Sequence, residues 1–331
     1  MTAIICDRLV REKQAGGYSM KRVVMTGPTG AIGMALIEYL SNRDVQVIAV
    51  VRGNSKRKNQ IKESEKVLKV ECALAEMVEL PQRIQTVIER RSWDRDIPID
   101  VFYHFAWDGT FGDSRNDMYM QNRNVTYALD AVSAASKLGC GTFIGAGSQA
   151  EYGRYEGKLN AKVAVFPESG YGIAKLCAGQ MTRILCEQKG MRHIWTRILS
   201  VYGPYDGCNT MIMSMVRKMM EGERASCTKG EQMWDYLYSK DAAKMMYLLG
   251  EKGVDGKTYC LGSGITKPLR EYIEIIRNTI NPQAEVGYGD VAYSSKQVMY
   301  LCADIEELIK DTGYTSEYSF ESGIKETIEF C

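Results

Sequence analysis

Hydrophobic residues along the chain alternate between short runs and helical repeats. From Lys21 the sequence reads KRVVMTG, an apolar run that ends in glycine and predicts a buried strand. Between residues 31 and 40 the apolar positions recur at helical spacing, and a second run covers 45–51. Two parallel strands need such a crossover helix, so this part of the chain predicts a βαβ unit.

The alternation of strands and helices continues to about residue 203. It predicts further strands at 67–72, 99–106, 142–146 and 194–201, and helices at 77–91, 117–138 and 171–189. This order is typical of an α/β fold with a doubly wound parallel sheet, the Rossmann architecture. We therefore assign residues 20–203 to a Rossmann domain that holds NADP(H) and the catalytic residues.

The remaining segments differ in pattern. Residues 204–331 are less regular and richer in Met, Tyr and Gly, which predicts a smaller mixed lobe that mainly binds substrate and is interleaved with the Rossmann domain. Residues 1–19 show little periodicity and are interpreted as an N-terminal appendage. No run approaches the roughly 18 apolar residues that span a bilayer, so neither export nor membrane anchoring is expected.

The composition of the chain argues against several classes of function. The formal net charge of +1 provides no overall field for nucleic acid or an anionic membrane, so neither is an expected partner. Ten cysteines are scattered without a CxxC motif, which favours reduced thiols in the cytoplasm over a disulfide framework. The two histidines, His104 and His193, lie far apart, so neither a metal site nor a histidine-based hydrolase is expected. His104 lies among aromatic residues and is interpreted as a core residue.

A glycine-rich turn joins the first strand to the first helix, with the sequence GPTGAIG at residues 27–33. Glycine lets the backbone turn tightly and approach a pyrophosphate, and the helix N-terminus adds unpaired N–H groups and the positive end of a dipole. The turn lies between a strand and a helix, as a dinucleotide-binding turn must. We therefore expect a dinucleotide to bind at Gly27, Thr29, Gly30, Ala31, Ile32 and Gly33.

The end of the second strand indicates which dinucleotide. NAD-binding versions of this unit carry an Asp or Glu there, which accepts hydrogen bonds from the ribose. Here Arg52 follows Val51. A guanidinium can bind a 2′-phosphate through two charge-assisted hydrogen bonds, with Lys56 and Arg57 as further cations nearby. We therefore expect NADP(H), while NAD(H) remains an alternative.

A Tyr-x-x-x-Lys motif supplies the candidate chemistry. Tyr171 and Lys175 are four residues apart in a predicted helix, so they lie on one face. A phenol is a useful acid–base group near neutral pH only if a positive charge favours its phenolate form, and Lys175 and the nicotinamide can supply that charge. Ser148, at the end of the fifth strand, can hydrogen-bond the same substrate oxygen. These three residues are therefore the expected catalytic triad.

Several motifs together resemble the extended short-chain dehydrogenase/reductases of the NAD-dependent epimerase/dehydratase family: GPTGAIG, FYHFAW, GSQAEYG, YGIAK and RILSVYGP. The resemblance covers about residues 21–330 and implies an enzyme that acts on a nucleotide-activated sugar. It matches Ser148, Tyr171 and Lys175 to the family's catalytic Ser/Thr, Tyr and Lys. It also implies that these enzymes often form homodimers through two helices of the large domain, here those at 117–138 and 171–189.

The same resemblance suggests further site residues. Asn124 matches an asparagine that supports the active site, although a capping or surface amide fits its spacing almost as well. Ala106 would lie beside the nicotinamide, and Trp107 would form a wall of the sugar site or pack in the core. Ser200 stands in the loop to the nucleotide sugar, where relatives usually carry asparagine.

Departures from the family pattern indicate the reaction. Dehydratases of this family carry Asp-Glu after the catalytic Ser/Thr, whereas this chain has Gln149 and Ala150, so dehydration is disfavoured and Gln149 is a candidate substrate contact. Trp234 replaces the usual Arg before an Asp-Tyr pair, and is interpreted as a substrate contact or a packing residue. In this segment the chain most resembles the reductases of NDP-4-keto-6-deoxyhexoses, a group that includes the abequose synthases. We expect such a reductase; an NDP-sugar 4-epimerase and a non-catalytic NADP(H) sensor are the alternatives.

Overall fold

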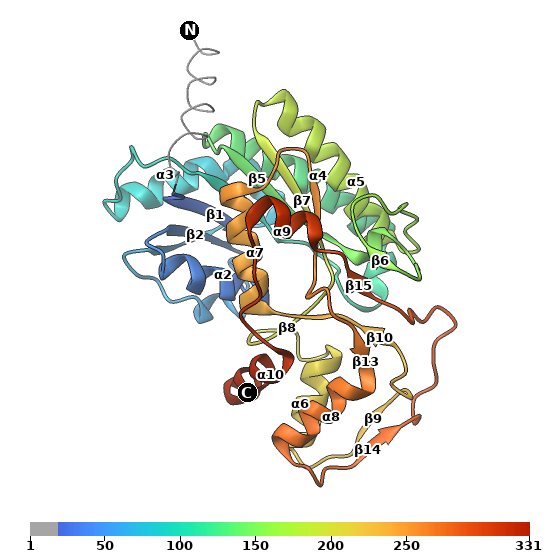
Figure 1. Cartoon of the computed structure of the whole chain (residues 1–331). Coiled ribbons are helices and arrows are strands. Elements are labelled where there is room, and N and C mark those ends of the chain that lie inside the picture. Colours follow the sequence, from blue (N-terminus) through green and yellow to red (C-terminus); the bar gives the residue numbers. More distant parts are fainter. Residues whose placement is uncertain (1–18) are drawn as a thin grey trace.

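The computed structural model describes residues 19–331, and its centre is a seven-stranded sheet in the order β12-β7-β5-β4-β1-β2-β3. Every pair of neighbouring strands in this sheet is parallel (Figure 1). The strands are β1 (Arg22–Thr26), β2 (Gln46–Val51), β3 (Val67–Glu71), β4 (Val101–His104), β5 (Thr142–Ser148), β7 (Arg192–Ile198) and β12 (Thr258–Leu261). The expected doubly wound parallel sheet is confirmed. The expected appendage lies, apart from Ser19, outside the described residues.

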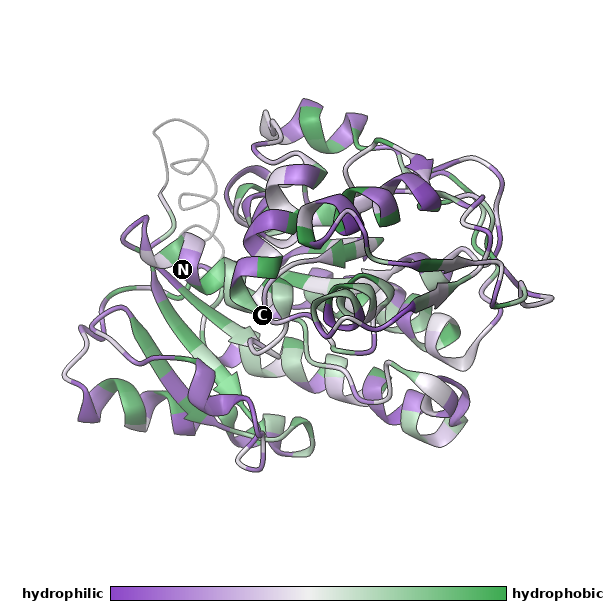
Figure 2. Cartoon of the chain, turned by 90° about the horizontal axis from the view of Figure 1, so that it is seen from below, coloured by the Kyte–Doolittle hydropathy of each residue, from purple (hydrophilic) through white to green (hydrophobic). Residues whose placement is uncertain are grey.

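Helices cover both faces of the sheet because its strands are apolar on both sides. All residues of β1 are buried, and the strands of the sheet appear mostly green in Figure 2. One face packs against α2 (Ala31–Ser41), α7 (Ser239–Lys252) and α9 (Glu306–Thr312), and the other against α3 (Leu80–Arg90), α4 (Met118–Lys137) and α5 (Gly170–Gln188). Val23 and Val24, adjacent in β1, belong to these two separate cores, as the alternation of side chains along a strand requires.

The structure differs from the sequence expectations at three elements. The strand expected at 194–201 divides into β7 and β8 (Ser200–Tyr202), and β8 leaves the sheet to pair with β11 (Tyr236–Tyr238). The helix expected at 77–91 begins as a 3-10 turn at Leu74–Glu79 and becomes α-helical as α3. The seventh strand, β12, was not expected; it comes from the C-terminal part of the chain and pairs with β7.

A smaller mixed lobe lies below the sheet in Figure 1. It contains α6 (Met211–Met220), β9 (Ala225–Cys227), β10 (Met233–Trp234), β13 (Lys267–Pro268), α8 (Leu269–Ile280), β14 (Val286–Tyr288) and α10 (Phe320–Phe330). Its own apolar core joins α6, α8 and α10. A further short pair, β6 (Lys158–Leu159) with β15 (Cys302–Ala303), lies at the edge of the large domain. After residue 203 the chain contributes to both parts of the molecule. The lobe contains α6, α8 and α10, whereas the large domain contains α7, β12 and α9.

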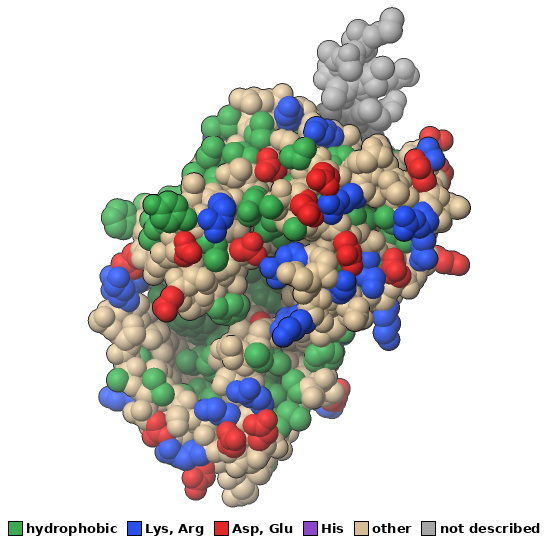
Figure 3. All heavy atoms as spheres, turned by 180° about the vertical axis from the view of Figure 1, so that it is seen from behind, with side chains coloured by type: hydrophobic (Ala, Val, Ile, Leu, Met, Phe, Trp, Pro, Cys, Tyr) green, Lys and Arg blue, Asp and Glu red, His purple; other side chains and the backbone are tan. Residues whose placement is uncertain are grey.

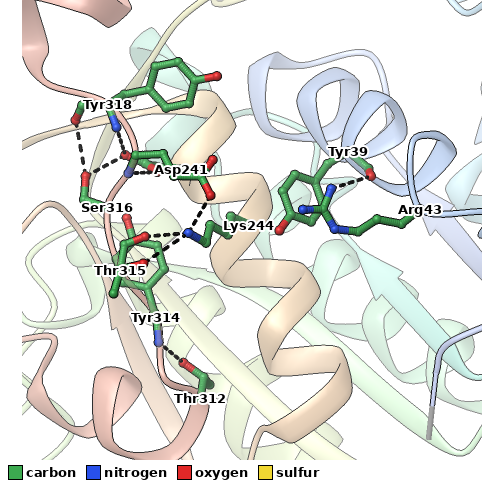
Figure 4. A network of polar contacts seen from close by, with 10 residues as sticks. Tyr39, Arg43, Asp241, Lys244, Thr312, Tyr314, Thr315, Ser316 and Tyr318 are labelled. Carbon is green, nitrogen blue, oxygen red and sulfur yellow. Dashed lines mark hydrogen bonds and ion pairs between the residues drawn. The ribbon is translucent and has the colours of Figure 1, made fainter. Parts of the chain in front are cut away.

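A polar network connects the segment between α9 and α10 to helix α7 (Figure 4). Asp241 accepts hydrogen bonds from Ser316 Oγ and from the backbone N–H groups of Glu317 and Tyr318. Lys244 Nζ donates to the backbone oxygen of Thr315 and forms an ion pair with Glu317. These contacts hold the segment that leads from the large domain into α10 of the lobe.

Candidate active site

A cavity of about 310 Å³ lies at the carboxyl ends of the central strands. Ligands of doubly wound sheets bind at this edge, because the loops that leave the strands diverge there. Figure 3 shows the molecule hollowed between the large body and the smaller lobe. The lining residues are Gly27, Gly30, Ala31, Ile32, Gly33, Phe105, Trp107, Thr110, Ala146, Gly147, Ser148, Tyr171, Lys175, Ile198, Leu199, Val201 and Asp206.

The glycine turn has the shape that a dinucleotide requires. Gly27 has φ +66°, and a Cβ there would stand 2.6 Å from the backbone nitrogen of Ala106. A Cβ on Gly33 would stand 2.5 Å from the backbone oxygen of Pro28, whereas one on Gly30 would meet no atom within 4 Å. Helix α2 begins here without a side-chain cap and without an acidic residue in its first turn. The cradle therefore fits a pyrophosphate at the α2 N-terminus.

Ser148 and Tyr171 meet in this cavity from neighbouring elements. Ser148 ends β5, and Tyr171 lies in the first turn of α5, which Ser169 caps by accepting a hydrogen bond from the Gly172 N–H. Burial raises the pKa of the Tyr171 phenol above its ordinary value, and a hydrogen bond with Ser148 lowers the same pKa in part. The pair is placed so that one substrate oxygen could contact both hydroxyl groups.

Lys175 is buried one helical turn after Tyr171. Its Nζ donates a hydrogen bond of 2.6 Å to the backbone oxygen of Ala146 and lies 3.8 Å from the centroid of the Trp107 ring. The distance from Nζ to the centroid of the Tyr171 ring is 5.7 Å. Burial lowers the pKa of Lys175 to about 7, and the negative charge of Glu151 partly opposes this shift. Its positive charge is therefore partial near neutral pH.

A second cation, Arg115, also faces the phenol. Its Cζ lies 4.3 Å from the centroid of the Tyr171 ring, and its charge lowers the pKa of Tyr171. Sequence reasoning assigned the supporting charge to Lys175 and the nicotinamide and missed Arg115. No local signal could have found it, because residues 115 and 171 become neighbours only when the loop after β4 packs on α5.

Glu151 is a further residue that sequence reasoning did not place in the site. Its side chain is fully buried, and Oε1 accepts hydrogen bonds from the Ser148 backbone N–H at 2.8 Å and from Trp195 Nε1 at 3.0 Å. Oε2 accepts from Arg197 Nε at 2.7 Å. Glu151 does not line the cavity. It holds the end of β5, and therefore Ser148, in place.

The loop after β4 is held by two buried amides of α4. Asn124 Nδ2 donates to the backbone oxygen of Asp108 at 2.9 Å, and Asn124 Oδ1 accepts from the Asp108 N–H at 2.9 Å. Gln121 Oε1 accepts from Trp107 Nε1 at 2.9 Å. Asn124 is 1% exposed, so the alternative of a surface amide is wrong. The ring of Trp107 stands edge-on to that of Tyr171, with centroids 6.2 Å apart, and lines the cavity.

The expected phosphate cation, Arg52, lies beside the cavity without lining it. Its side chain is 59% exposed, and one Nη forms an ion pair of 3.3 Å with Asp108 Oδ1. The pair joins the loop after β2 to the loop after β4, and β1 lies between these strands in the sheet. Arg57, from the same loop as Arg52, donates to the backbone oxygen of Tyr205. Thr29 and Ala106 belong to the turn and the end of β4 but do not line the cavity.

Three expected substrate residues also lie outside the cavity lining. Ser200 and Trp234 contact each other, with a hydrogen bond of 2.8 Å from Trp234 Nε1 to Ser200 Oγ. The Oε1 atom of Gln149 is buried without a hydrogen-bond partner. Asp206, which the sequence pattern did not indicate, does line the cavity, and burial raises its pKa although hydrogen bonds from Thr210 and the Gly207 N–H oppose the shift.

His104 is buried, its Nδ1 lies 2.9 Å from Thr26 Oγ1, and burial lowers its pKa to about 3, so the ring is neutral. Among residues 19–331, no cluster of three or more His, Cys, Asp or Glu side chains could hold a metal ion. In the same part of the chain, no helix is both long and apolar enough to cross a membrane.

Comparisons with known proteins agree with this geometry. The model of the NAD dependent epimerase/dehydratase family matches residues 23–262. CDP-abequose synthase from Salmonella muenchen is 24% identical over 93% of this chain and 97% of its own, as expected from the motifs. ADP-L-glycero-D-manno-heptose-6-epimerase from Pseudomonas paraeruginosa is 24% identical over 91% of this chain and 96% of its own.

Solved structures resemble the whole fold. UDP-N-acetylglucosamine 4-epimerase from Methanobrevibacter ruminantium has a TM-score of 0.82 at 20% identity, over 95% of this chain and 98% of that one. UDP-glucose 4-epimerase from Thermotoga maritima has a TM-score of 0.80 at 20% identity, over 93% and 98% of the two chains. With the family model covering most of the chain, the assignment is plain: this protein belongs to the NAD dependent epimerase/dehydratase family.

Proposed function

We propose that the protein is an NADP(H)-dependent oxidoreductase that reduces the C4 ketone of an NDP-4-keto-6-deoxyhexose. The observation that carries the proposal is a single cavity that contains the glycine turn together with Ser148, Tyr171 and Lys175. The similarity to CDP-abequose synthase, which extends over nearly the full length of both chains, supports this substrate class.

The residues of the cavity suit proton transfer to a ketone oxygen. When bound, the nicotinamide coenzyme supplies the hydride that the carbonyl carbon receives. Tyr171 donates its phenolic proton to the carbonyl oxygen, and Ser148 donates a hydrogen bond to the same oxygen as negative charge develops. Tyr171 is left as a phenolate and must regain a proton before the next turnover. Lys175 and Arg115 provide positive charge that stabilises this phenolate.

The preference for NADP(H) over NAD(H) rests on Arg52. It follows β2, where an NAD enzyme of this architecture carries a carboxylate, and its guanidinium is 59% exposed and therefore available to a 2′-phosphate. Its partner Asp108 is also exposed, and an exposed ion pair of this kind is weak enough for a phosphate to displace.

The hydrogen bonds that Glu151 accepts support reduction over dehydration. Elimination of water needs its own acid and base near the sugar. Gln149 and Ala150 cannot titrate, and both carboxylate oxygens of Glu151 are occupied by Ser148, Trp195 and Arg197. A 4-epimerase is the second candidate, because the similar solved structures include 4-epimerases of UDP-glucose, UDP-N-acetylglucosamine and UDP-glucuronic acid. A sensor without activity is disfavoured, because Ser148, Tyr171 and Lys175 are all present in one cavity.

Coenzyme consumption distinguishes the two enzymatic candidates. The protein is mixed with NADPH and with CDP-, dTDP-, UDP- or GDP-4-keto-6-deoxyhexose, each generated by a matching dehydratase. Loss of one NADPH per sugar, followed at 340 nm, is the expected result, and Tyr171→Phe should lower the rate by about 10²-fold or more while NADPH still binds. Conversion of an ordinary NDP-hexose into its C4 epimer without net coenzyme change would replace the reductase with the epimerase.

We further propose that the enzyme is a homodimer in the cytoplasm. Helix α5 carries exposed apolar residues at helical spacing, namely Ile173, Met181 and Ile184, and α4 begins with exposed Met118 and Tyr119. Such a stripe is self-complementary when two copies meet across a two-fold axis. The cysteines of residues 19–331 are free thiols, which supports a reducing compartment.

A further inference from the structure

Arg115 lies across the face of the phenol that the proposed reaction uses. It belongs to the 3-10 helix Gly112–Asn116 in the loop between β4 and α4. Its Cζ is 4.3 Å from the centroid of the Tyr171 ring, within the range of a cation–π contact. One Nη donates a hydrogen bond of 3.2 Å to the backbone oxygen of Thr110, a residue that lines the cavity. Arg115 itself does not line it.

Neighbouring contacts fix the position of this arginine. The adjacent Asn116 accepts a hydrogen bond of 3.0 Å from the backbone N–H of Gly170, which begins α5 immediately before Tyr171. A Cβ on Gly170 would stand 3.1 Å from the backbone oxygen of Arg115, so glycine allows this close approach. The loop and the first turn of α5 are therefore joined. Backbone contacts near Gly170, in addition to the side chain of Arg115, hold this arginine against Tyr171.

The charges around Tyr171 show why a permanent cation matters there. From α5, Lys175 Nζ lies 5.7 Å from the ring centroid, but burial lowers its pKa to about 7, so its charge is partial at neutral pH. From the 3-10 helix after β5, the negative charge of Glu151 raises the pKa of Tyr171. From β5, Ser148 lowers this pKa through a hydrogen bond. A guanidinium stays charged throughout the working pH range.

We propose that Arg115 is a positioning residue for proton transfer: its guanidinium, lying over the Tyr171 ring, makes this phenol a stronger acid than burial alone would allow. The inference rests on the proposed function in one respect, that Tyr171 transfers the proton. A cation beside the ring attracts the phenolate more strongly than the neutral phenol. Removal of Arg115 therefore weakens the acid without removing a group that touches substrate.

The first test is the pH profile of NADPH-dependent reduction in Arg115→Gln, Arg115→Lys and the parent protein. Reduction needs the protonated phenol, so kcat/KM falls as the pH rises through the pKa of Tyr171. In Arg115→Gln this alkaline fall should move up by about half to one pH unit, with a several-fold lower rate at neutral pH. Arg115→Lys, which keeps a cation, should restore part of both effects. The matched control Arg91→Gln, an exposed arginine at the end of α3, should change neither.

The second test does not depend on substrate or activity. 3-Fluorotyrosine is incorporated at position 171, where the fluorine lowers the pKa of the phenol and serves as a ¹⁹F NMR probe. In coenzyme-free protein, Arg115→Gln should move the titration of this signal to higher pH, and Arg115→Lys should move it less. A confirmed NMR shift in a protein that reduces no 4-keto sugar would separate this inference from the proposed reaction.

An unchanged ¹⁹F titration in folded Arg115→Gln would overturn the proposal. A rise in KM with an unmoved pH profile would likewise overturn it, since Arg115 would then act by binding substrate. If Arg115→Gln fails to fold by circular dichroism, Arg115→Lys decides the question, because it keeps the charge and the long side chain. A ¹⁹F titration of the lysine variant that lies at slightly higher pH than that of the parent then supports the proposal, and one identical to that of the parent overturns it.

Discussion

Trp234 Nε1 donates a hydrogen bond of 2.8 Å to Ser200 Oγ, and so joins two of the positions at which this chain departs from the family pattern. The family resemblance implies asparagine and arginine at these positions; Ser200 is expected in the loop to the nucleotide sugar, and Trp234 is interpreted as a substrate contact or a packing residue. We expect Trp234→Phe to remove the donor while keeping the ring. The change should lower the free energy of unfolding by about 0.5–1.5 kcal/mol, measured in urea, and should raise KM for the nucleotide sugar several-fold.

A double-mutant cycle tests whether the two residues act together. Ser200→Ala should lower the free energy of unfolding about as much as Trp234→Phe does. The double variant should lower it little more than either single variant, because the two substitutions remove the same hydrogen bond. The dissociation constant for NADPH should stay unchanged in all three variants. Fully additive losses of stability and fully additive rises in KM would show that the contact is incidental to sugar binding.

Arg52 should decide between the two coenzymes. Arg52→Gln removes a charge-assisted contact to the 2′-phosphate, which is worth about 1.5–3 kcal/mol, so the Kd for NADPH should rise by about tenfold or more. The Kd for NADH should change little. Asp108→Asn should have the opposite effect, because it removes the partner of Arg52 in the 3.3 Å ion pair. It should tighten NADPH binding by less than about fivefold. Equal effects on both coenzymes, measured by fluorescence titration, would remove Arg52 from phosphate recognition.

The parallel sheet could be predicted because its signals are local. Runs such as that of β1 are buried throughout, and α4 and α5 begin at the side-chain caps Asp117 and Ser169. The four residues of β12 have no such signal. They form a strand because they pair with β7, which lies some sixty residues earlier in the chain. A pairing over that distance depends on the tertiary fold and cannot be read from periodicity.

The candidate site likewise contains some residues that local sequence signals predict and others that only the tertiary fold brings into place. The glycine turn is set within one turn of the chain and the Tyr171–Lys175 spacing within one helix, and residues of both line the cavity. Glu151 and Arg115 act across elements: Glu151 reaches Arg197 on β7, and Arg115 reaches Tyr171 on α5. No signal in the sequence pointed to either role, because burial and partners appear only when the chain is folded.

A single charge on the exposed stripe of α5 should separate the proposed dimer. Each two-fold interface would bury two copies of a carboxylate introduced by Met181→Glu, at a cost of several kcal/mol for each charge, so dimer affinity should fall by more than about 100-fold. Light scattering with size-exclusion chromatography measures the mass. Met220→Glu, at the end of α6, is the control, since its side chain is 48% exposed and that of Met181 is 44% exposed. A dimer that survives Met181→Glu would place the interface elsewhere.

Lys175 should make stability depend on pH in the neutral to alkaline range. Its pKa is about 7 in the folded protein, against an ordinary value of 10.5. Between these values the unfolded chain binds more protons than the folded one, so the contribution of Lys175 to stability rises as the pH increases from 7 to 10.5. Below pH 7 the folded protein buries a charged ammonium, and the unfavourable contribution is then complete.

Lys175→Met should therefore lose activity and also lose this pH dependence. Because the variant leaves the backbone oxygen of Ala146 without its 2.6 Å hydrogen bond, its absolute stability carries an extra, pH-independent cost. The slope is consequently the informative quantity: the free energy of unfolding of the variant relative to the parent should fall by up to a few kcal/mol between pH 7 and 10. Lys189→Met, at the exposed end of the same helix, should give a difference that is flat with pH. A flat difference for Lys175→Met as well would mean that the buried ammonium keeps its ordinary proton affinity, and Lys175 would then supply Tyr171 with a full positive charge at neutral pH.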